Sequence, residues 1–368
     1  MMSILRRKKD QFKVEDVESY LSDRKTIEFA GSGDPHEEKG KIRLLLENLK
    51  TTTPDMLLFD GDYLAEPAYL KAGVDQSEIA RDSVVILKDL LETLQDCPVP
   101  SYCVAGNYEM FGTTSDAVEE IGSDMIIDVG SDKKSDSIRD RIHPDDIYMD
   151  LQSVRTTWPG GVHEKSGFAF IGVEGSNPIN QTFPGERSEE NLKWATEHAI
   201  SKVKKDPKNV IIATHSPPFG MRDRLGRFGV PPHLWGAQKG SIALRELADE
   251  YRPFMILVGH IHEAFGAYIS VKRKDETGEL VEETVDLDFG NRSKITIGYD
   301  TSKTSATITL NKGTLEYWNW SRVRIAEDGN LRIMDIEGEW LDRKGRKKPF
   351  KKFSQILDYD DVLASKIG

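Results

Sequence analysis

The sequence has little cysteine and no long apolar run. Only two of its 368 residues are cysteines, Cys97 and Cys103. Cys103 lies in an apolar segment typical of a buried strand, so neither a disulfide framework nor a thiolate metal site is indicated. No apolar run approaches the roughly 20 residues that cross a bilayer, and the basic start of the chain lacks the apolar stretch of a signal peptide. We therefore expect a protein of the cytoplasm, a reducing compartment, without membrane contact.

Basic residues are also fewer than acidic ones, with 50 Lys and Arg against 62 Asp and Glu. The formal net charge is -12, which works against non-specific binding of a nucleic-acid backbone. Basic runs at 6–9 and 343–352 are typical of solvated chain ends.

The hydrophobic content of 38% is enough for a large core. We expect one domain over residues 25–340, a basic N-terminal extension over 1–24, and a tail over 341–368 that is basic and then acidic.

Short apolar runs alternate with amphipathic stretches over the first 260 residues. Such alternation predicts a layered α/β fold with the sheet buried between helices. After residue 266 the pattern changes to alternating strands broken by turns, which predicts a β-rich layer that completes a sandwich with the first sheet. The polar, irregular segment 112–160 indicates a surface insertion. Strands are expected at 26–30, 55–60, 101–105, 167–173, 209–214 and 254–259, and helices around 42–49, 79–94 and 192–203.

Polar side chains follow five of the predicted strands. In open α/β sheets, ligands bind outside the carboxyl ends of the strands, so these positions are informative. One histidine beside a strand is commonly a loop or core residue. Seven groups with metal-binding chemistry at one edge of a sheet are hard to obtain by chance and favour a metal site. They are Asp34 and His36, Asp62, Asn107, His215, and the pair His260 and His262.

The chemistry of these seven groups restricts the metal. Imidazole nitrogen, carboxylate oxygen and amide oxygen without thiolate suit Mn, Fe, Zn, Ni or Co. Seven ligands are too many for one tetrahedral ion. They suit two divalent ions that share a bridging carboxylate, an arrangement that clamps the attacking and leaving oxygens in a displacement at phosphorus.

The order and spacing of these residues resemble the calcineurin-like metallophosphoesterases over about residues 26–325. The resemblance rests on Asp34-x-His36, Gly61-Asp62, Gly106-Asn107, His215 and Gly259-His260-x-His262. Segments such as "THSPPFG" at 214–220 and "GHIHEAFG" at 259–266 are similar in particular to the small cytosolic branch of that family. The motifs are specific to the family and not to a substrate.

The resemblance implies a fold, a site and an activity. The fold is a four-layer α/β/β/α sandwich of two mixed sheets flanked by helices. The activity is metal-dependent hydrolysis of phosphodiester or phosphomonoester bonds in a small-molecule substrate, by attack of a hydroxide held between the ions. Asn107, His215 and the residue after Asn107 would be catalytic. One metal would be bound by Asp34, His36 and His262, the second by Asn107, His215 and His260, and Asp62 would bridge them.

Two departures from the family pattern affect the proton donor. The family usually has a histidine after the Gly-Asn pair, where this chain has Tyr108, and an aspartate that orients it, where this chain has Ala65. Tyrosine, with a pKa near 10, is a poorer proton donor at neutral pH than histidine. We therefore expect good leaving groups to be favoured. Glu66 or His233 could supply the proton instead, although a plain loop role is the simpler interpretation of His233.

The remaining departures remove no predicted ligand. Glu37 stands where the family often has glycine, and 311–317 reads "NKGTLEY" where the family often has Asn-Pro-Gly-Ser. His143, His163 and His198 match no motif and are expected to be surface or structural residues.

Two rival functions remain open at this point. The first is a non-catalytic metal-binding scaffold that binds a protein partner, which the changed proton-donor positions permit. The second is a nuclease, since the same metal chemistry cleaves nucleic-acid diesters, but the acidic net charge disfavours it. The sequence determines neither the oligomeric state nor the physiological substrate.

Overall fold

The computed structural model describes most of the predicted domain. Within the described residues the strands form two mixed sheets, one of eight strands and one of seven. Outside them lie the predicted extension 1–24, most of the predicted insertion 112–160, and most of the predicted tail 341–368. The described residues are 26–64, 85–108, 126–128, 162–226, 232–289, 294–340 and 354–358, apart from 88, 91, 95, 174, 178–185, 202, 275–276 and 316–318.

The first sheet is parallel on one side and mainly antiparallel on the other. Its order is β15-β11-β14-β13-β1-β2-β3-β4. The strands β1 to β4 run parallel to one another, and β13 pairs antiparallel with β1. The bounds are β1 (Thr26–Gly33), β2 (Met56–Asp60), β3 (Ser101–Val104), β4 (Ile126–Asp128), β11 (Lys294–Asp300), β13 (Asn319–Asp328), β14 (Leu331–Trp340) and β15 (Ser354–Asp358).

The second sheet has the same mixed character. Its order is β10-β9-β12-β8-β7-β6-β5. The central strands β12, β8, β7 and β6 are parallel, and β9 pairs antiparallel with β10 and β12. The bounds are β5 (Val162–Lys165), β6 (Phe168–Val173), β7 (Val210–Thr214), β8 (Met255–Val258), β9 (Gly266–Lys274), β10 (Leu280–Asp288) and β12 (Thr304–Asn311).

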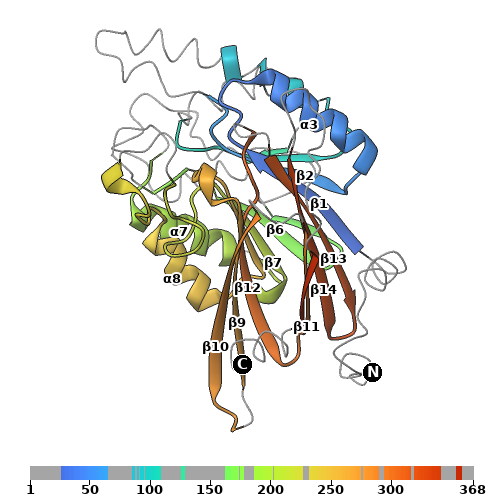
Figure 1. The fold of residues 1–368 in the computed structure, drawn as a ribbon, viewed down its shortest axis with the longest axis vertical. Coiled ribbons are helices and arrows are strands. Elements are labelled where there is room, and N and C mark those ends of the chain that lie inside the picture. The colour runs from blue at the N-terminus through green and yellow to red at the C-terminus, as the bar shows by residue number, and fades with distance from the viewer. Residues whose placement is uncertain are drawn as a thin grey trace.

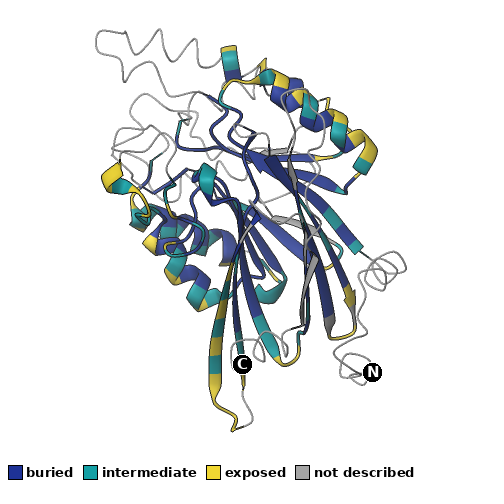
Figure 2. Ribbon diagram, in the orientation of Figure 1, coloured by how far each residue is buried: buried dark blue, intermediate teal, exposed yellow. Residues whose placement is uncertain are grey.

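The two sheets pack face to face, and helices cover their outer faces (Figure 1). Phe29 of β1 meets Phe170 of β6 edge to face, with ring centroids 6.0 Å apart, inside a cluster that draws buried apolar residues from both sheets. Helix α3 (Lys39–Thr52) buries Ile42, Leu45 and Leu49 against the first sheet, since residues three and four apart share one helix face. The helices α7 (Glu189–Ser201) and α8 (Ile242–Tyr251) cover the second sheet in the same way. Figure 2 shows the buried residues along the strands and on the inward sides of the helices. The predicted α/β/β/α sandwich is confirmed.

The strands after residue 266 do not form the separate β-rich layer that the sequence predicted. β11, β13, β14 and β15 extend the first sheet, whereas β9, β10 and β12 extend the second. In each sheet, the strands from the first part of the chain leave one edge open. Later strands pair with this edge, antiparallel or parallel, and satisfy its backbone N–H and C=O groups. β15 lies within the segment predicted as a tail and pairs with β11. Among the described helices, none is long and apolar enough to cross a membrane.

Candidate metal centre

The seven predicted ligands all lie just past the ends of parallel strands. Asp34 directly follows β1, Asp62 follows β2 and Asn107 follows β3, all in the first sheet. In the second sheet His215 directly follows β7, and β8 leads into His260 and the short 3-10 helix η5 (His262–Ala264). Because both sheets present the carboxyl ends of these strands at one edge, ligands from both sheets meet there.

Four of these ligands have a left-handed backbone conformation. The φ angles are 48° at Asp34, 45° at His36, 45° at Asp62 and 62° at His260. Non-glycine residues rarely adopt this region, and the strain costs about 1–3 kcal/mol at each position. Such strain persists where the surrounding structure fixes the loop and is commonly found at functional sites. Here it turns each side chain away from its strand and toward the centre.

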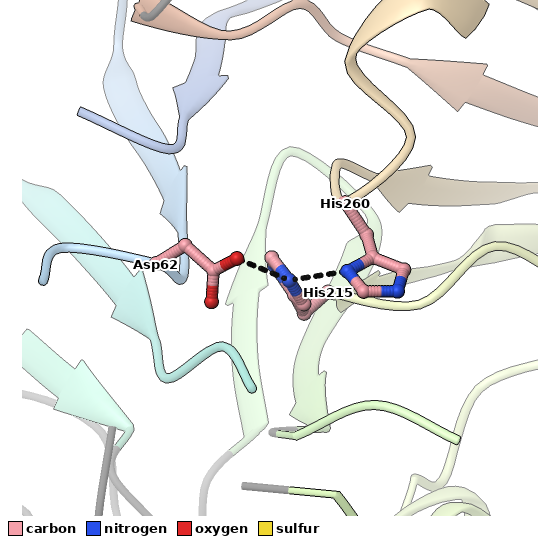
Figure 3. A group of neighbouring side chains, drawn as sticks. All are labelled: Asp62, His215 and His260. Atoms are coloured by element: carbon pink, nitrogen blue, oxygen red, sulfur yellow. Dashed lines mark hydrogen bonds and ion pairs between the residues drawn. The ribbon is translucent and has the colours of Figure 1, made fainter. Parts of the chain in front are cut away.

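His215 is the centre of the first group of ligand atoms. Its Nε2 lies 2.9 Å from Asn107 Oδ1, 3.0 Å from His260 Nδ1 and 3.3 Å from Asp62 Oδ2. Figure 3 shows Asp62 and His260 directed at the His215 ring from opposite sides. One ligand atom each from Asp62, His215 and His260 lies within 4.8 Å of the other two. These atoms are close enough to bind one ion.

Asp62 uses its two carboxylate oxygens differently. Oδ1 accepts hydrogen bonds from the backbone N–H groups of Asn107, at 2.9 Å, and Tyr108, at 3.1 Å. Oδ2 is the oxygen that faces His215. The side chain is only 4% exposed. One oxygen is therefore fixed by the backbone, and the other is left for the site.

A second group of ligand atoms comes from Asp34, His36 and His262. His262 Nε2 lies 3.4 Å from Asp34 Oδ2 and 3.4 Å from His36 Nε2. His36 Nδ1 lies 3.1 Å from the carbonyl oxygen of Leu64. Since a carbonyl only accepts hydrogen bonds, Nδ1 carries the proton and Nε2 of the neutral ring keeps its lone pair. A histidine oriented in this way by a backbone carbonyl is typical of metal ligands.

Burial strongly shifts the protonation of the carboxylates and imidazoles. Burial raises the pKa of Asp34 to about 8, against the opposing effect of His215 and His262. Burial would lower the pKa of His215, but the carboxylates of Asp62 and Asp34 outweigh it and raise this pKa to about 9. Burial and the nearby His215 lower the pKa of His260 to about 3. At neutral pH and without metal, this group of buried carboxylates and imidazoles therefore retains bound protons.

The donor set suits divalent cations. Asn107 Oδ1 faces His215 Nε2, His260 Nδ1 and the Asp62 carboxylate, and rotation of the amide by 180° would bring its NH₂ group 2.9 Å from His260 Nδ1. Oxygen and nitrogen lone pairs thus converge on a small volume from several directions. A cation removes the repulsion between such groups and requires their deprotonated forms. The residues present are therefore able to hold the metal that the sequence implied.

Tyr108 borders the Asp34–His36–His262 group. Its ring centroid lies 5.5 Å from that of His36, with the ring planes tilted by 53°. The residue is half-buried and packs against the apolar cluster beneath α3. The phenol ring thus lies beside the predicted ligand His36.

The other histidines and candidate proton donors have different placements. His198 lies on α7 and stacks on Trp194, with centroids 4.8 Å apart. His233 lies in the exposed 3-10 helix η4 (Pro232–Leu234). His163 lies in β5. Ala65, Glu66 and His143 lie outside the described residues.

Sequence reasoning missed an ion pair below the centre. Lys312 Nζ contacts Asp60 Oδ2, and both side chains are fully buried. The sequence contained two signals, an aspartate at the end of the apolar strand 56–60 and a lysine within the departure at 311–317. Neither signal indicated that the two residues pair, because they lie far apart in the chain.

Comparisons with known proteins identify the family of the chain. The chain belongs to the calcineurin-like phosphoesterase family, whose sequence profile matches residues 27–264, more than half of the chain. The family depends on two divalent metal ions. None of the curated proteins compared with the chain matches it.

Three solved structures match the chain at low sequence identity. One crystal structure matches 86% of this chain and 99% of its own, with a TM-score of 0.52 and 14% identity. The protein TT1561 of Thermus thermophilus matches with a TM-score of 0.43 and 11% identity, over 81% of this chain and 94% of its own. A dimetal phosphatase from Danio rerio matches with a TM-score of 0.41 and 12% identity, over 84% of this chain and 96% of its own.

Proposed function

We propose that this protein is a phosphoesterase that depends on two divalent metal ions and hydrolyses phosphodiester bonds in a small-molecule substrate. The observation that carries the proposal is the convergence of carboxylate, imidazole and amide groups from five strand ends of two sheets. Membership of the calcineurin-like phosphoesterase family supports it. The net charge of -12 favours a small substrate over a nucleic acid.

The two groups of side chains would hold the two ions. Asp62 would be shared by the two ions, and its Oδ2 faces the site because Oδ1 accepts hydrogen bonds from the backbone N–H groups of Asn107 and Tyr108. When bound, two such ions supply an activated water and positive charge against the phosphoryl oxygens. One ion would be held by Asp34, His36 and His262, and the other by Asn107, His215 and His260.

Tyr108 determines which leaving groups we expect the protein to favour. A phenol with a pKa near 10 stays protonated at neutral pH and donates its proton reluctantly. General acid catalysis typically contributes about 10²- to 10⁴-fold, mostly where the leaving oxygen is a strong base. An activated phosphodiester with an acidic leaving group needs little of this help. The proposed preference is therefore for such substrates over alkyl phosphates.

The test is hydrolysis of bis(p-nitrophenyl) phosphate while Mn²⁺ is added to the metal-free protein. We expect turnover that rises with Mn²⁺ and saturates. In His260→Ala it should fall by about 10²-fold or more, as expected when a metal ligand is removed. His198→Ala is the matched control, because His198 stacks on Trp194 of helix α7. Equal loss in both variants, or no turnover with Mn²⁺, Zn²⁺, Ni²⁺, Co²⁺ or Fe²⁺, would contradict the proposal.

A further inference from the structure

A fully buried ion pair lies beneath the candidate metal centre. Lys312 Nζ contacts Asp60 Oδ2, and both side chains are 0% exposed. Among the described residues, neither group has a further hydrogen-bonding partner. Burying two charges is costly, and apolar residues of similar volume often stabilise a fold at least as well. Stability alone therefore gives no reason for a charged pair at this position.

The pair connects the two sheets. Asp60 is the last residue of β2 in the first sheet, and Lys312 directly follows β12 in the second. The lysine stem packs on Gly31 of β1, where a Cβ would lie 2.8 Å from Lys312 Cδ. The backbone N–H of Lys312 donates to the carbonyl oxygen of Val258 at 3.2 Å. The ion pair thus joins the strand ends that carry the ligands.

The Asp60 carboxylate fills the space between two glycines that precede metal ligands. A Cβ on Gly33 would lie 2.0 Å from Asp60 Oδ1, and a Cβ on Gly259 would lie 2.7 Å from Asp60 Oδ2. Gly33 precedes Asp34, and Gly259 precedes His260. These two ligands belong to different proposed metal sites. The position of the carboxylate therefore affects the separation of the two backbone segments.

The segment around Lys312 also contacts both ligand loops. Thr314 Oγ1 donates to the backbone carbonyl oxygen of Asp34 at 3.1 Å. Asn311 Nδ2 donates to the carbonyl oxygen of Ile261, between the two histidines of the second loop, at 2.9 Å. The ion pair and these two hydrogen bonds act on the same two loops.

We propose that Asp60 and Lys312 form a positioning pair for the dinuclear centre. The lysine holds the Asp60 carboxylate between Gly33 and Gly259, and this sets the spacing of Asp34 and His260 for two neighbouring ions. The inference rests on the proposed dinuclear function. It goes beyond that function because it assigns a role to residues that do not themselves contact the metal.

The test is metal binding by the metal-free protein, measured by titration with Mn²⁺ in competition with a chromophoric chelator. The key variant is Asp60→Asn combined with Lys312→Met, which removes both charges and leaves no unpaired one. We expect this variant to be folded, with a cooperative unfolding transition. We expect it to bind at least one ion about 10- to 100-fold more weakly, the usual effect of losing a group that orients metal ligands. We also expect the electron paramagnetic resonance spectrum of the Mn²⁺-loaded protein to change, since it reports coupling between neighbouring ions.

Controls separate positioning from general stability. Arg332→Met removes another buried cation, which lies at the start of β14 and contacts the segment before β7. It should destabilise the fold without changing Mn²⁺ affinity. If the double variant does not fold, Asp60→Asn alone serves, because it keeps the side-chain shape and an acceptor for Lys312. If the folded double variant binds both ions with wild-type affinity, this inference is overturned, but the proposed function is not. A wild-type protein that binds no metal would overturn the proposed function, and this inference with it.

Discussion

The backbone N–H of Tyr108 donates a hydrogen bond to Asp62 Oδ1 over 3.1 Å. This contact ties Tyr108 to the proposed bridging ligand through the main chain. It does not depend on the identity of the side chain at 108, so substitutions there leave Asp62 in place. The role of the Tyr108 side chain can therefore be tested separately from metal binding.

The first prediction concerns Tyr108→His. Because an imidazole donates a proton more readily at neutral pH, we expect turnover of an alkyl phosphodiester to rise by about tenfold or more. Turnover of bis(p-nitrophenyl) phosphate should change by less than about threefold, since p-nitrophenolate leaves without a proton. The measurement is kcat/KM for both substrates at matched Mn²⁺ occupancy. Tyr108→Phe is the control, and equal gains on both substrates would show that the residue does not control leaving-group preference.

The second prediction concerns the stability of the metal-free protein between pH 6.5 and 8. Burial raises the pKa of Asp34 from 3.8 to about 8. Burial opposes protonation of His215, but nearby carboxylates raise its pKa from 6.5 to about 9. In this window the folded state holds protons that the unfolded state has released. Stability therefore falls as pH rises, by up to about 1.4 kcal/mol per pH unit for each proton.

Bound metal should reverse the sign of this effect. Metal requires the deprotonated ligands, so its affinity and its stabilising effect both grow with pH. Thermal unfolding from pH 6.5 to 8, with chelator and with saturating Mn²⁺, provides the measurement. We expect the difference between the two unfolding temperatures to widen toward pH 8. A difference that narrows would contradict the assignment of Asp34 and His215 as ligands.

The third prediction concerns Gly106→Ala. A Cβ at this position would lie 2.2 Å from Asp62 Oδ1, so the carboxylate or the loop must move. We expect Mn²⁺ affinity to fall by at least about tenfold, comparable with the loss of a group that orients a ligand. Gly40→Ala is the matched control, since a Cβ there meets no atom within 4 Å. Equal Mn²⁺ affinity in the two variants would argue against Asp62 as a bridging ligand.

The fourth prediction concerns the buried Arg332 on β14. Its guanidinium lies 4.8 Å from the ring centroid of Phe168 and 4.5 Å from that of Phe254. It also donates to the carbonyl oxygen of Lys208 at 2.6 Å, and so ties the two sheets together. We expect Arg332→Met to lower the free energy of unfolding by about 3 kcal/mol, as for a broken buried charge network. Arg332→Lys should recover little, because lysine lacks the planar fork of donors. Denaturant unfolding measures this, and full recovery in Arg332→Lys would contradict it.

The positions of the proposed ligands were predictable because they are local features of the sequence. Each follows a short apolar run, and parallel strands bring their carboxyl ends to one edge whatever the rest of the fold. His260 and His262 illustrate this, since the end of β8 alone places them at that edge. The helices α3 and α7 were predictable for a similar reason, because their apolar residues recur every three or four positions.

The buried charges were not predictable in the same way. Charged residues in a sequence are mostly exposed, and Lys312 and Arg332 are fully buried only because partners from distant strands surround them. The division of the C-terminal strands between the two sheets also escaped prediction. Alternating polar and apolar residues identify a strand, but they do not state which sheet edge it joins.

Anomalous X-ray diffraction from crystals grown with Mn²⁺ shows whether two ions share Asp62. We expect two anomalous peaks per chain, about 3.5–4 Å apart. One peak should lie beside Asp34, His36 and His262, the other beside Asn107, His215 and His260, with Asp62 Oδ2 between them. A single peak, or no peak at this edge of the sheets, would contradict the dinuclear site and favour a scaffold that does not catalyse phosphoester hydrolysis.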